Sequence, residues 1–219
     1  MKFKLFSKLG SLAGTELVLF LIAIAVFAAL LIGVLDYRSR VRKGLVKPAK
    51  LTTRALVYGA MCMTLSFVLS YFKLFSMPFG GSITLLSMLP LMLFACAFGP
   101  KMGFIAAFAY ALLQIVQGAW IVHPVQFVLD YFAAFLCLGI PAFFPKNLPL
   151  GVAVGGFARM LVSIVSGAVF FADGGLDYGI ANPWVYSFLY NFLTIGVDTV
   201  LCLIVAFIPK VKKLTGLMR

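Results

Sequence analysis

The chain has 219 residues, of which 63% are hydrophobic and only 11% are charged. A water-soluble domain normally carries about 25% charged residues, so this composition excludes a soluble protein and predicts a single membrane domain. The formal charge of +12 does not indicate nucleic-acid binding, because the cations lie in short segments between apolar runs and form no basic stripe with interleaved aromatic residues.

Seven apolar runs approach the length of about 20 residues that a helix needs to cross a bilayer. The predicted spans are 16–36, 55–72, 82–98, 103–118, 124–144, 151–171 and 186–208. Together they predict an all-α integral membrane protein.

The first span has features of both a membrane helix and a signal peptide. It follows a basic start and carries small residues at 25–29, as a cleavage site would. Its apolar run exceeds the 7–15 residues usual for a signal peptide, which favours an uncleaved helix. We therefore divide the chain into an extra N-terminal transmembrane helix (1–37), a basic linker (38–54) and a six-span membrane domain (55–219).

The cations predict the orientation of the spans. The linker 38–54 holds seven Lys and Arg residues, and the positive-inside rule places it in the cytoplasm. Alternation of the spans then places Lys101, Lys146 and the C-terminus in the cytoplasm and the N-terminus outside. The expected location is the plasma membrane, with several passes.

Small residues on the second span indicate a close helix–helix contact. Ala55 and Gly59 are four residues apart, a spacing that lets two helices approach closely within lipid. Packing inside the bundle would explain this pattern, but docking of a partner protein is the sharper hypothesis.

Polar residues inside lipid are costly and are therefore candidates for function. Four spans carry such residues at helical spacing, so each span presents one polar face. These faces hold Tyr110, Gln114 and Gln117; Gln126 and Asp130; Arg159, Ser163, Ser166 and Phe170; and Ser187, Asn191, Thr194 and Asp198. We expect the four faces to meet inside the bundle.

Depth separates these residues into two layers. With a rise of about 1.5 Å per residue, Asp130, Ser163 and Asn191 lie in the outer half of the membrane. Arg159 and Asp198 both lie roughly 18 Å below the outer ends of their helices, and we expect a structural ion pair between them.

The outer layer has the character of a binding site. Asp130 has no cation at its depth in any span, which predicts contact with a cationic or hydrogen-bond-donating ligand; the alternative is a protonated or water-bonded carboxyl group. Tyr131 and Tyr186 flank this layer and could cover a flat aromatic ligand, whereas Trp120 and Trp184 are typical of an interfacial aromatic belt.

Catalytic and metal sites are not indicated. His123 has no second His or Cys with ligand spacing, and the four cysteines lie within apolar runs. There is no phosphate-binding Gly-rich loop, so the chain carries no ATPase site of this type. We expect no enzyme activity, no metal and no cofactor.

From about residue 51 onward the chain resembles the thiamine-specific substrate-binding (S) subunits of energy-coupling-factor (ECF) vitamin transporters. The resemblance is carried by Arg54-Ala55-Leu56-Val57-Tyr58-Gly59, by Pro124-Val125-Gln126-Phe127-Val128-Leu129-Asp130-Tyr131, by Ala158-Arg159 with Ser163 and Gly167, and by Trp184-Val185-Tyr186-Ser187 with Asn191. It implies a six-helix bundle that captures its vitamin from outside. A separate module of one transmembrane coupling protein and two ATPase subunits then supplies the energy.

The resemblance also implies a set of site residues. Asp130 stands where the family usually has Glu, Ser163 where it usually has His, and Phe171 where it usually has Trp. The positions that match are Tyr131, Gly167, Tyr186 and Asn191, and the helix with Ala55 and Gly59 is the one that docks on the coupling protein. The extra first helix has no counterpart.

Two hypotheses of different classes follow. The first is a substrate-binding subunit for thiamine or a related small molecule. The alternative is a membrane scaffold or assembly protein that recruits a partner through the extra helix and the basic linker.

Overall fold

The computed structural model describes Leu35, Ser39, Arg42 and residues 51–218. The predicted first span and nearly all of the basic linker lie outside the described residues. The predicted boundary between these two segments therefore stays a prediction.

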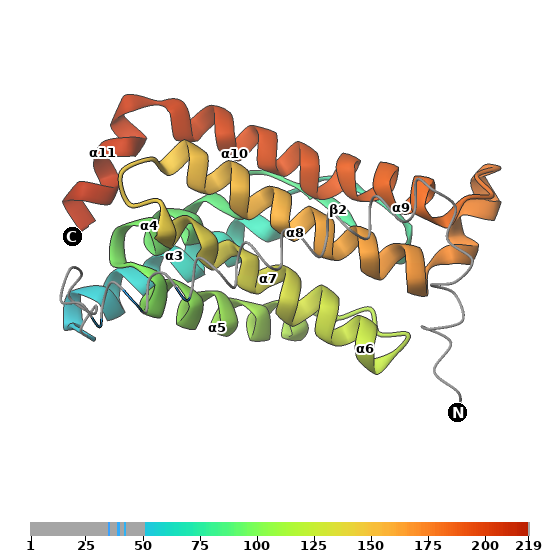
Figure 1. The fold of residues 1–219 in the computed structure, drawn as a ribbon, viewed down its shortest axis with the longest axis horizontal. Helices are drawn as coiled ribbons and strands as arrows, with labels where there is room; N and C mark the ends of the chain where they lie inside the picture. The colour runs from blue at the N-terminus through green and yellow to red at the C-terminus, as the bar shows by residue number, and fades with distance from the viewer. Residues whose placement is uncertain (1–34, 36–38, 40–41, 43–50, 219) are drawn as a thin grey trace.

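Five helical segments of the described chain are long and apolar enough to cross a membrane. They are α3 (Thr53–Tyr71), α5 (Pro100–Gly118), the run Pro124–Phe143, α8 (Leu148–Phe170) and the run Pro183–Phe207. They lie side by side along the long axis of the molecule (Figure 1). The prediction of an all-α membrane protein is confirmed, with one small β-hairpin as its exception.

Two of these runs contain a change of helical pitch. The first consists of α6 (Pro124–Phe127), the π-helical η2 (Val128–Ala133), α7 (Ala134–Leu136) and the 3₁₀ segment η3 (Cys137–Phe143). The second consists of α9 (Pro183–Asn191), the π-helical η5 (Phe192–Gly196) and α10 (Val197–Phe207). Single π-helical turns inside α-helices are frequent at functional sites.

Polar side chains and prolines start the long helices. The side chains of Thr52, Asn147 and Asn182 accept backbone N–H groups at the starts of α3, α8 and α9. A proline occupies the first turn of α5, α6, α8 and α9, where its missing N–H has no helical partner to lose. The helix boundaries are thus set by local chemistry.

Helix α4 (Leu89–Phe98) is too short to span a bilayer and lies inside the bundle. Every residue from Leu89 to Ala97 is buried, as expected for a helix that is apolar all round. The predicted span 82–98 is therefore wrong over its first seven residues, because residues 82–84 form a strand and the helix begins only at Leu89.

The segment before α4 forms a hairpin. Strand β1 (Lys73–Ser76) pairs antiparallel with β2 (Ser82–Thr84), and the 3₁₀ turn η1 (Pro78–Gly80) joins them. Strand β2 of this hairpin packs against η5 and α10. Helix η4 (Ala172–Tyr178) connects α8 with α9.

Ala55 and Gly59 lie on an internal contact. Ala55 is 1% exposed, and a Cβ atom on Gly59 would lie 3.1 Å from the Phe94 ring of α4. The prediction that these two residues dock a partner protein is wrong, because both are buried within the same chain, Gly59 against Phe94 of α4. The small side chains serve the packing of α3 against α4.

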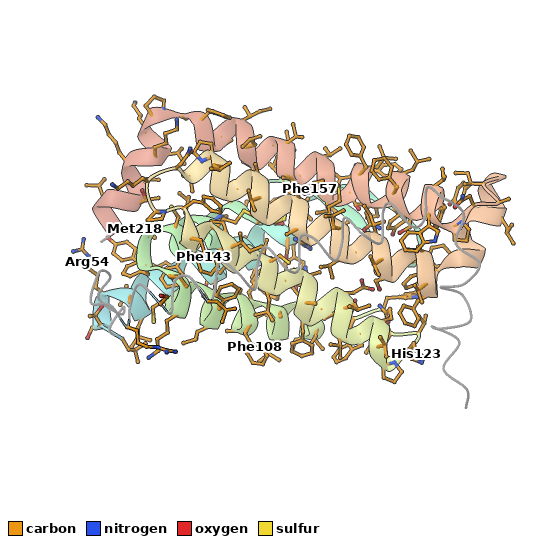
Figure 2. The ribbon with its side chains drawn as sticks, in the orientation of Figure 1. Arg54, Phe108, His123, Phe143, Phe157 and Met218 are labelled. Carbon is orange, nitrogen blue, oxygen red and sulfur yellow. The ribbon has the colours of Figure 1, made fainter. Side chains whose placement is uncertain are left out.

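Positive charge gathers at one end of the bundle. Helix α11 (Pro209–Met218) lies at this end and carries exposed Lys210, Lys212 and Lys213. Arg54 Nη2 donates to the carbonyl oxygen of Leu217 at 2.6 Å, which ties α3 to α11. Figure 2 shows Arg54 and Met218 at this end and His123 at the opposite end.

The α3–α4 contact predicts a specific cost for added volume. Gly59→Leu should destabilise the protein by about 1–3 kcal/mol, since overpacking forces the Phe94 ring to move. The exposed neighbour Ala60 is the matched control, and Ala60→Leu should change stability by less than about 0.5 kcal/mol. Thermal unfolding of both variants in detergent measures the difference, and equal midpoints would show that the two helices do not pack closely.

Candidate functional site

The four predicted polar faces meet around one cavity of about 250 Å³. Its wall is formed by the hairpin, α5, the α6–η2 run, α8 and the α9–η5–α10 run. Ser166 and Phe170, which were predicted to belong to the α8 face, do not line it: Ser166 is fully buried, and the Phe170 ring stacks on His123 at 5.0 Å.

All seven residues that the sequence proposed for ligand binding line this cavity. They are Asp130, Tyr131, Ser163, Gly167, Phe171, Tyr186 and Asn191. Segments up to 61 positions apart in the chain, from Asp130 to Asn191, thus converge on one space.

Asp130 lies on the π-helical segment η2 and is held by Gln126. Gln126 Nε2 donates to Asp130 Oδ2 at 2.7 Å and to the Trp120 carbonyl oxygen at 3.1 Å. Gln126 is itself 2% exposed, and its Oε1 accepts from Val122 N at 3.1 Å. The Ser166 hydroxyl also interacts with the Asp130 carboxyl group, which lines the cavity and can accept a further donor from a ligand.

Asn191 joins α9 to α8. Its Nδ2 donates to the carbonyl oxygens of Ser187 and Ser163 at 2.9 and 3.3 Å, and Ser187 Oγ donates to the Ile164 carbonyl oxygen at 2.7 Å. A Cβ atom on Gly167 would clash with Ser187 Oγ, so this close contact requires glycine there. Asn191 Oδ1 receives no donor from the part of the chain that the structure describes.

Aromatic rings close one end of the cavity. The Phe79 ring lies 5.8 Å from Phe171 and 6.5 Å from Trp120, measured between centroids. Phe79 has a φ of 58°, a left-handed conformation that is uncommon for a bulky residue and is typical of functional segments. Tyr131 belongs to the same end, because its hydroxyl oxygen accepts from Trp120 N at 2.7 Å.

Asp198 closes the opposite end of the cavity. Its Oδ2 accepts from Thr84 Oγ1 at 2.7 Å and from Ser87 Oγ at 3.1 Å, and its Oδ1 accepts from Leu86 N at 3.0 Å. We call this set of bonds the Asp198 clasp. It fixes the connection between the hairpin and α4 onto α10.

The predicted ion pair between Arg159 and Asp198 is wrong. Neither residue has an ion-pair partner among the described side chains, and Asp198 satisfies its oxygens with the clasp instead. The guanidinium of Arg159 lies over the Phe135 ring, 4.2 Å from its centroid. The similar depth of Arg159 and Asp198 did not identify the partner of Asp198. Residues 82–88 were predicted as part of a helix, so Thr84, Leu86 and Ser87 were not considered as its donors.

Several residues of the wall escaped prediction. Tyr190 lines the cavity, and its hydroxyl oxygen accepts from Gly81 N at 2.8 Å, which joins α9 to the hairpin. Tyr190 follows Tyr186 by four residues, so helical spacing could have identified it. Phe79, Thr84 and Ser87 could not be found in this way, since they lie outside regular helix.

The cavity is equipped for binding. No cluster of three or more His, Cys, Asp or Glu residues occurs in the described ranges, and no disulfide joins the four cysteines. The wall offers carboxylate and amide acceptors, hydroxyl groups and aromatic faces, which suit a small polar aromatic molecule.

Comparison with known proteins gives a consistent result. Residues 56–217 match the thiamine transporter protein family. The chain is 31% identical over 147 residues to the thiamine transporter ThiT of Bacillus subtilis (strain 168), covering 59% of this chain and 75% of that protein.

One solved structure shows a similar fold, and a second was also compared. ThiT from Listeria monocytogenes superimposes with a TM-score of 0.56 at 23% identity, over 72% of this chain and 96% of that one. The S-component for biotin from an ECF-type ABC transporter gives a TM-score of 0.49 at 19% identity, over 75% and 94% of the two chains.

The Asp198 clasp predicts an energetic coupling. A hydrogen bond to a charged group contributes about 1.5–3 kcal/mol, so a double-mutant cycle of Asp198→Ala with Thr84→Ala should show a coupling of roughly that size. The same cycle with Arg159→Ala in place of Thr84→Ala should give a coupling smaller by at least about 1 kcal/mol. Thermal unfolding measures both coupling energies. A larger coupling of Asp198 with Arg159 than with Thr84 would instead support the ion pair.

Proposed function

The chain belongs to the thiamine transporter family, and from this premise we propose that it is the substrate-binding subunit of an importer for thiamine or a closely related compound. The observation that carries the proposal is the convergence of Asp130 and its six predicted partners on one cavity. As a member of a transporter family, the chain is a membrane transport protein and not an enzyme.

Two oxygen acceptors in the cavity suit the N–H donors of an aminopyrimidine ring. The Asp130 carboxyl group and Asn191 Oδ1 lie on facing helical runs, and both residues line the cavity. An exocyclic amine or a protonated ring nitrogen can donate to these two acceptors. Binding through such groups would be specific, because a ligand without them leaves buried acceptors unpaired.

The aromatic groups suit a cationic ring. Tyr131, Tyr186 and Phe171 line the same cavity as Asp130. A thiazolium ring can stack on such faces and gain cation–π attraction, which is worth about 2 kcal/mol or more when water is excluded. Asp130 adds an opposite charge in the same space.

Two positions leave room for a relative of thiamine. Ser163 and Phe171 are smaller than the His and Trp that the resemblance leads us to expect there. The smaller side chains remove a polar ring and part of a stacking surface from the wall. A ligand that carries an additional substituent on one ring would use this space.

The proposed energy source is a separate module with one transmembrane coupling protein and two ATPase subunits. The sequence has no ATPase loop of its own. Since Ala55 and Gly59 are buried, a partner protein would contact α3 through its outward face. It presents exposed Leu56, Val57, Met61, Leu65 and Val68.

The charges support an orientation with the C-terminus in the cytoplasm and the N-terminus outside. Exposed Lys101 and Lys146 lie at the starts of α5 and α8, at the end of the bundle that holds α11 (Figure 1). Trp120, whose ring contacts Phe79 at the aromatic end of the cavity, is three residues before His123, which lies at the opposite end of the bundle (Figure 2). The cavity would then receive its ligand from outside.

The proposal predicts a strong dependence of binding on Asp130. Asp130→Asn should weaken thiamine binding by about ten- to hundredfold, since it removes a charged acceptor worth about 1.5–3 kcal/mol. Asp130→Glu, which keeps the charge, is the matched control and should bind more tightly than Asp130→Asn. Isothermal titration calorimetry on the purified full chain measures all three proteins.

Two further variants test the pocket size. Ser163→His combined with Phe171→Trp should raise the affinity for thiamine, since it restores the ring partners implied by the resemblance.

If Asp130→Asn binds the ligand as tightly as the unmodified protein, the carboxyl group is structural and the assignment of the cavity is wrong.

A further inference from the structure

Arg159 is the one cationic side chain on the helical part of the cavity wall within the described residues. Its Nε is fully buried and has no hydrogen-bond partner. No hydrogen bond or ion pair from its guanidinium group to any described residue is present. The group contacts the face of Phe135 instead, at 4.2 Å from the ring centroid.

This arrangement leaves strong donors without acceptors. A guanidinium group carries five N–H donors and keeps its charge at every accessible pH. The interaction with a ring face offsets part of the cost of burial but accepts no directed hydrogen bond. Inside a protein, a charge is stable only when it is paired and hydrogen-bonded.

The nearby acids do not supply the missing acceptors. Asp198 receives Thr84, Ser87 and Leu86 as donors, and Cys202 Sγ lies 3.7 Å from its Oδ1. Asp130 is bound to Gln126 on the other run of the wall. Both carboxylates compensate the charge of Arg159 at longer range without occupying its N–H groups.

The position of Arg159 within the cavity defines a second subsite. Along α8, Arg159 lies eight residues before Gly167, which corresponds to about 12 Å along the helix axis. Gly167 belongs to the end with the aromatic rings and Asn191. An elongated ligand whose ring occupies that end extends toward Arg159.

We infer that Arg159 is a ligand-contacting residue, and that the deep end of the cavity is a subsite for an acceptor oxygen on the tail of the ligand. The inference rests on the proposed function and deepens it. Thiamine carries a hydroxyethyl tail, and its phosphate esters carry phosphate oxygens at the same place. Both present the same chemistry to a guanidinium group, and the phosphate would be bound by the planar fork in a bidentate manner.

The experiment compares ligands that differ only in the tail. Thiamine, thiamine monophosphate and the analogue with ethyl in place of hydroxyethyl are titrated calorimetrically into the full chain. The unmodified protein should bind thiamine or its monophosphate at least about tenfold more tightly than the ethyl analogue, as expected for a lost bond to a charged group. If thiamine binds more tightly than its monophosphate, the oxygen at the subsite is the hydroxyl oxygen; if the monophosphate binds more tightly, it is a phosphate oxygen.

The variants then locate that preference. In Arg159→Gln the preference should fall below about threefold, and in Arg159→Lys it should be intermediate, since Lys keeps the charge but lacks the fork. Lys101→Gln removes an exposed cation outside the cavity and should keep the full preference. Should Arg159→Gln fail to fold, Arg159→Lys alone still has to show a reduced preference.

The outcomes separate the two proposals. The subsite is rejected if the unmodified protein binds thiamine and the ethyl analogue equally tightly. It is also rejected if Arg159→Gln and Arg159→Lys keep the full preference for the ligands with a tail oxygen. In either case Arg159 is a structural cation. A structural role would lower the affinity for all three ligands equally. If the unmodified protein binds none of the three, the proposed function fails and the subsite fails with it.

Discussion

A polar side chain in the hydrocarbon core must find its partners within the protein, and the described bundle is arranged around this constraint. Four helical runs carry polar faces, and none of them can turn that face toward lipid without a large cost. They enclose a shared cavity, while α4 fills the remaining apolar interior. The hairpin and the turn after it supply the hydroxyl and backbone donors to Asp198.

The three charged residues of the helical wall satisfy the constraint to different degrees. Asp198 is saturated by the clasp and has the character of a structural element. Asp130 is half-satisfied by Gln126, and Arg159 has a ring face but no acceptor. Asp130 and Arg159, whose hydrogen-bonding capacity is not filled within the described chain, both line the cavity, where a ligand can contact them. The π-helical turns at η2 and η5 lie beside the same space.

Much of the fold and of the candidate site could be predicted from the sequence, because helical spacing reports which side chains share a face. Asp130, Asn191 and Ser163 were correctly expected to lie together. Spacing says nothing about which donors reach a given acid, so the partner of Asp198 was misassigned to Arg159. The hairpin was not predicted, because its second strand falls within the apolar run 82–98. Gly59 was interpreted as a partner contact, because small residues four apart are expected both at an internal helix contact and at a contact with another protein.

The central claim is that the cavity binds thiamine or a close relative in the native fold. A ligand that binds the folded state alone raises its stability with the logarithm of its excess over the dissociation constant. The most direct measurement is therefore thermal unfolding of the purified full chain in the presence of each B vitamin in turn. The account predicts a concentration-dependent rise in the midpoint with thiamine or its derivatives and no such rise with the other vitamins. A chain whose midpoint no thiamine compound raises, or which another vitamin stabilises instead, would contradict it.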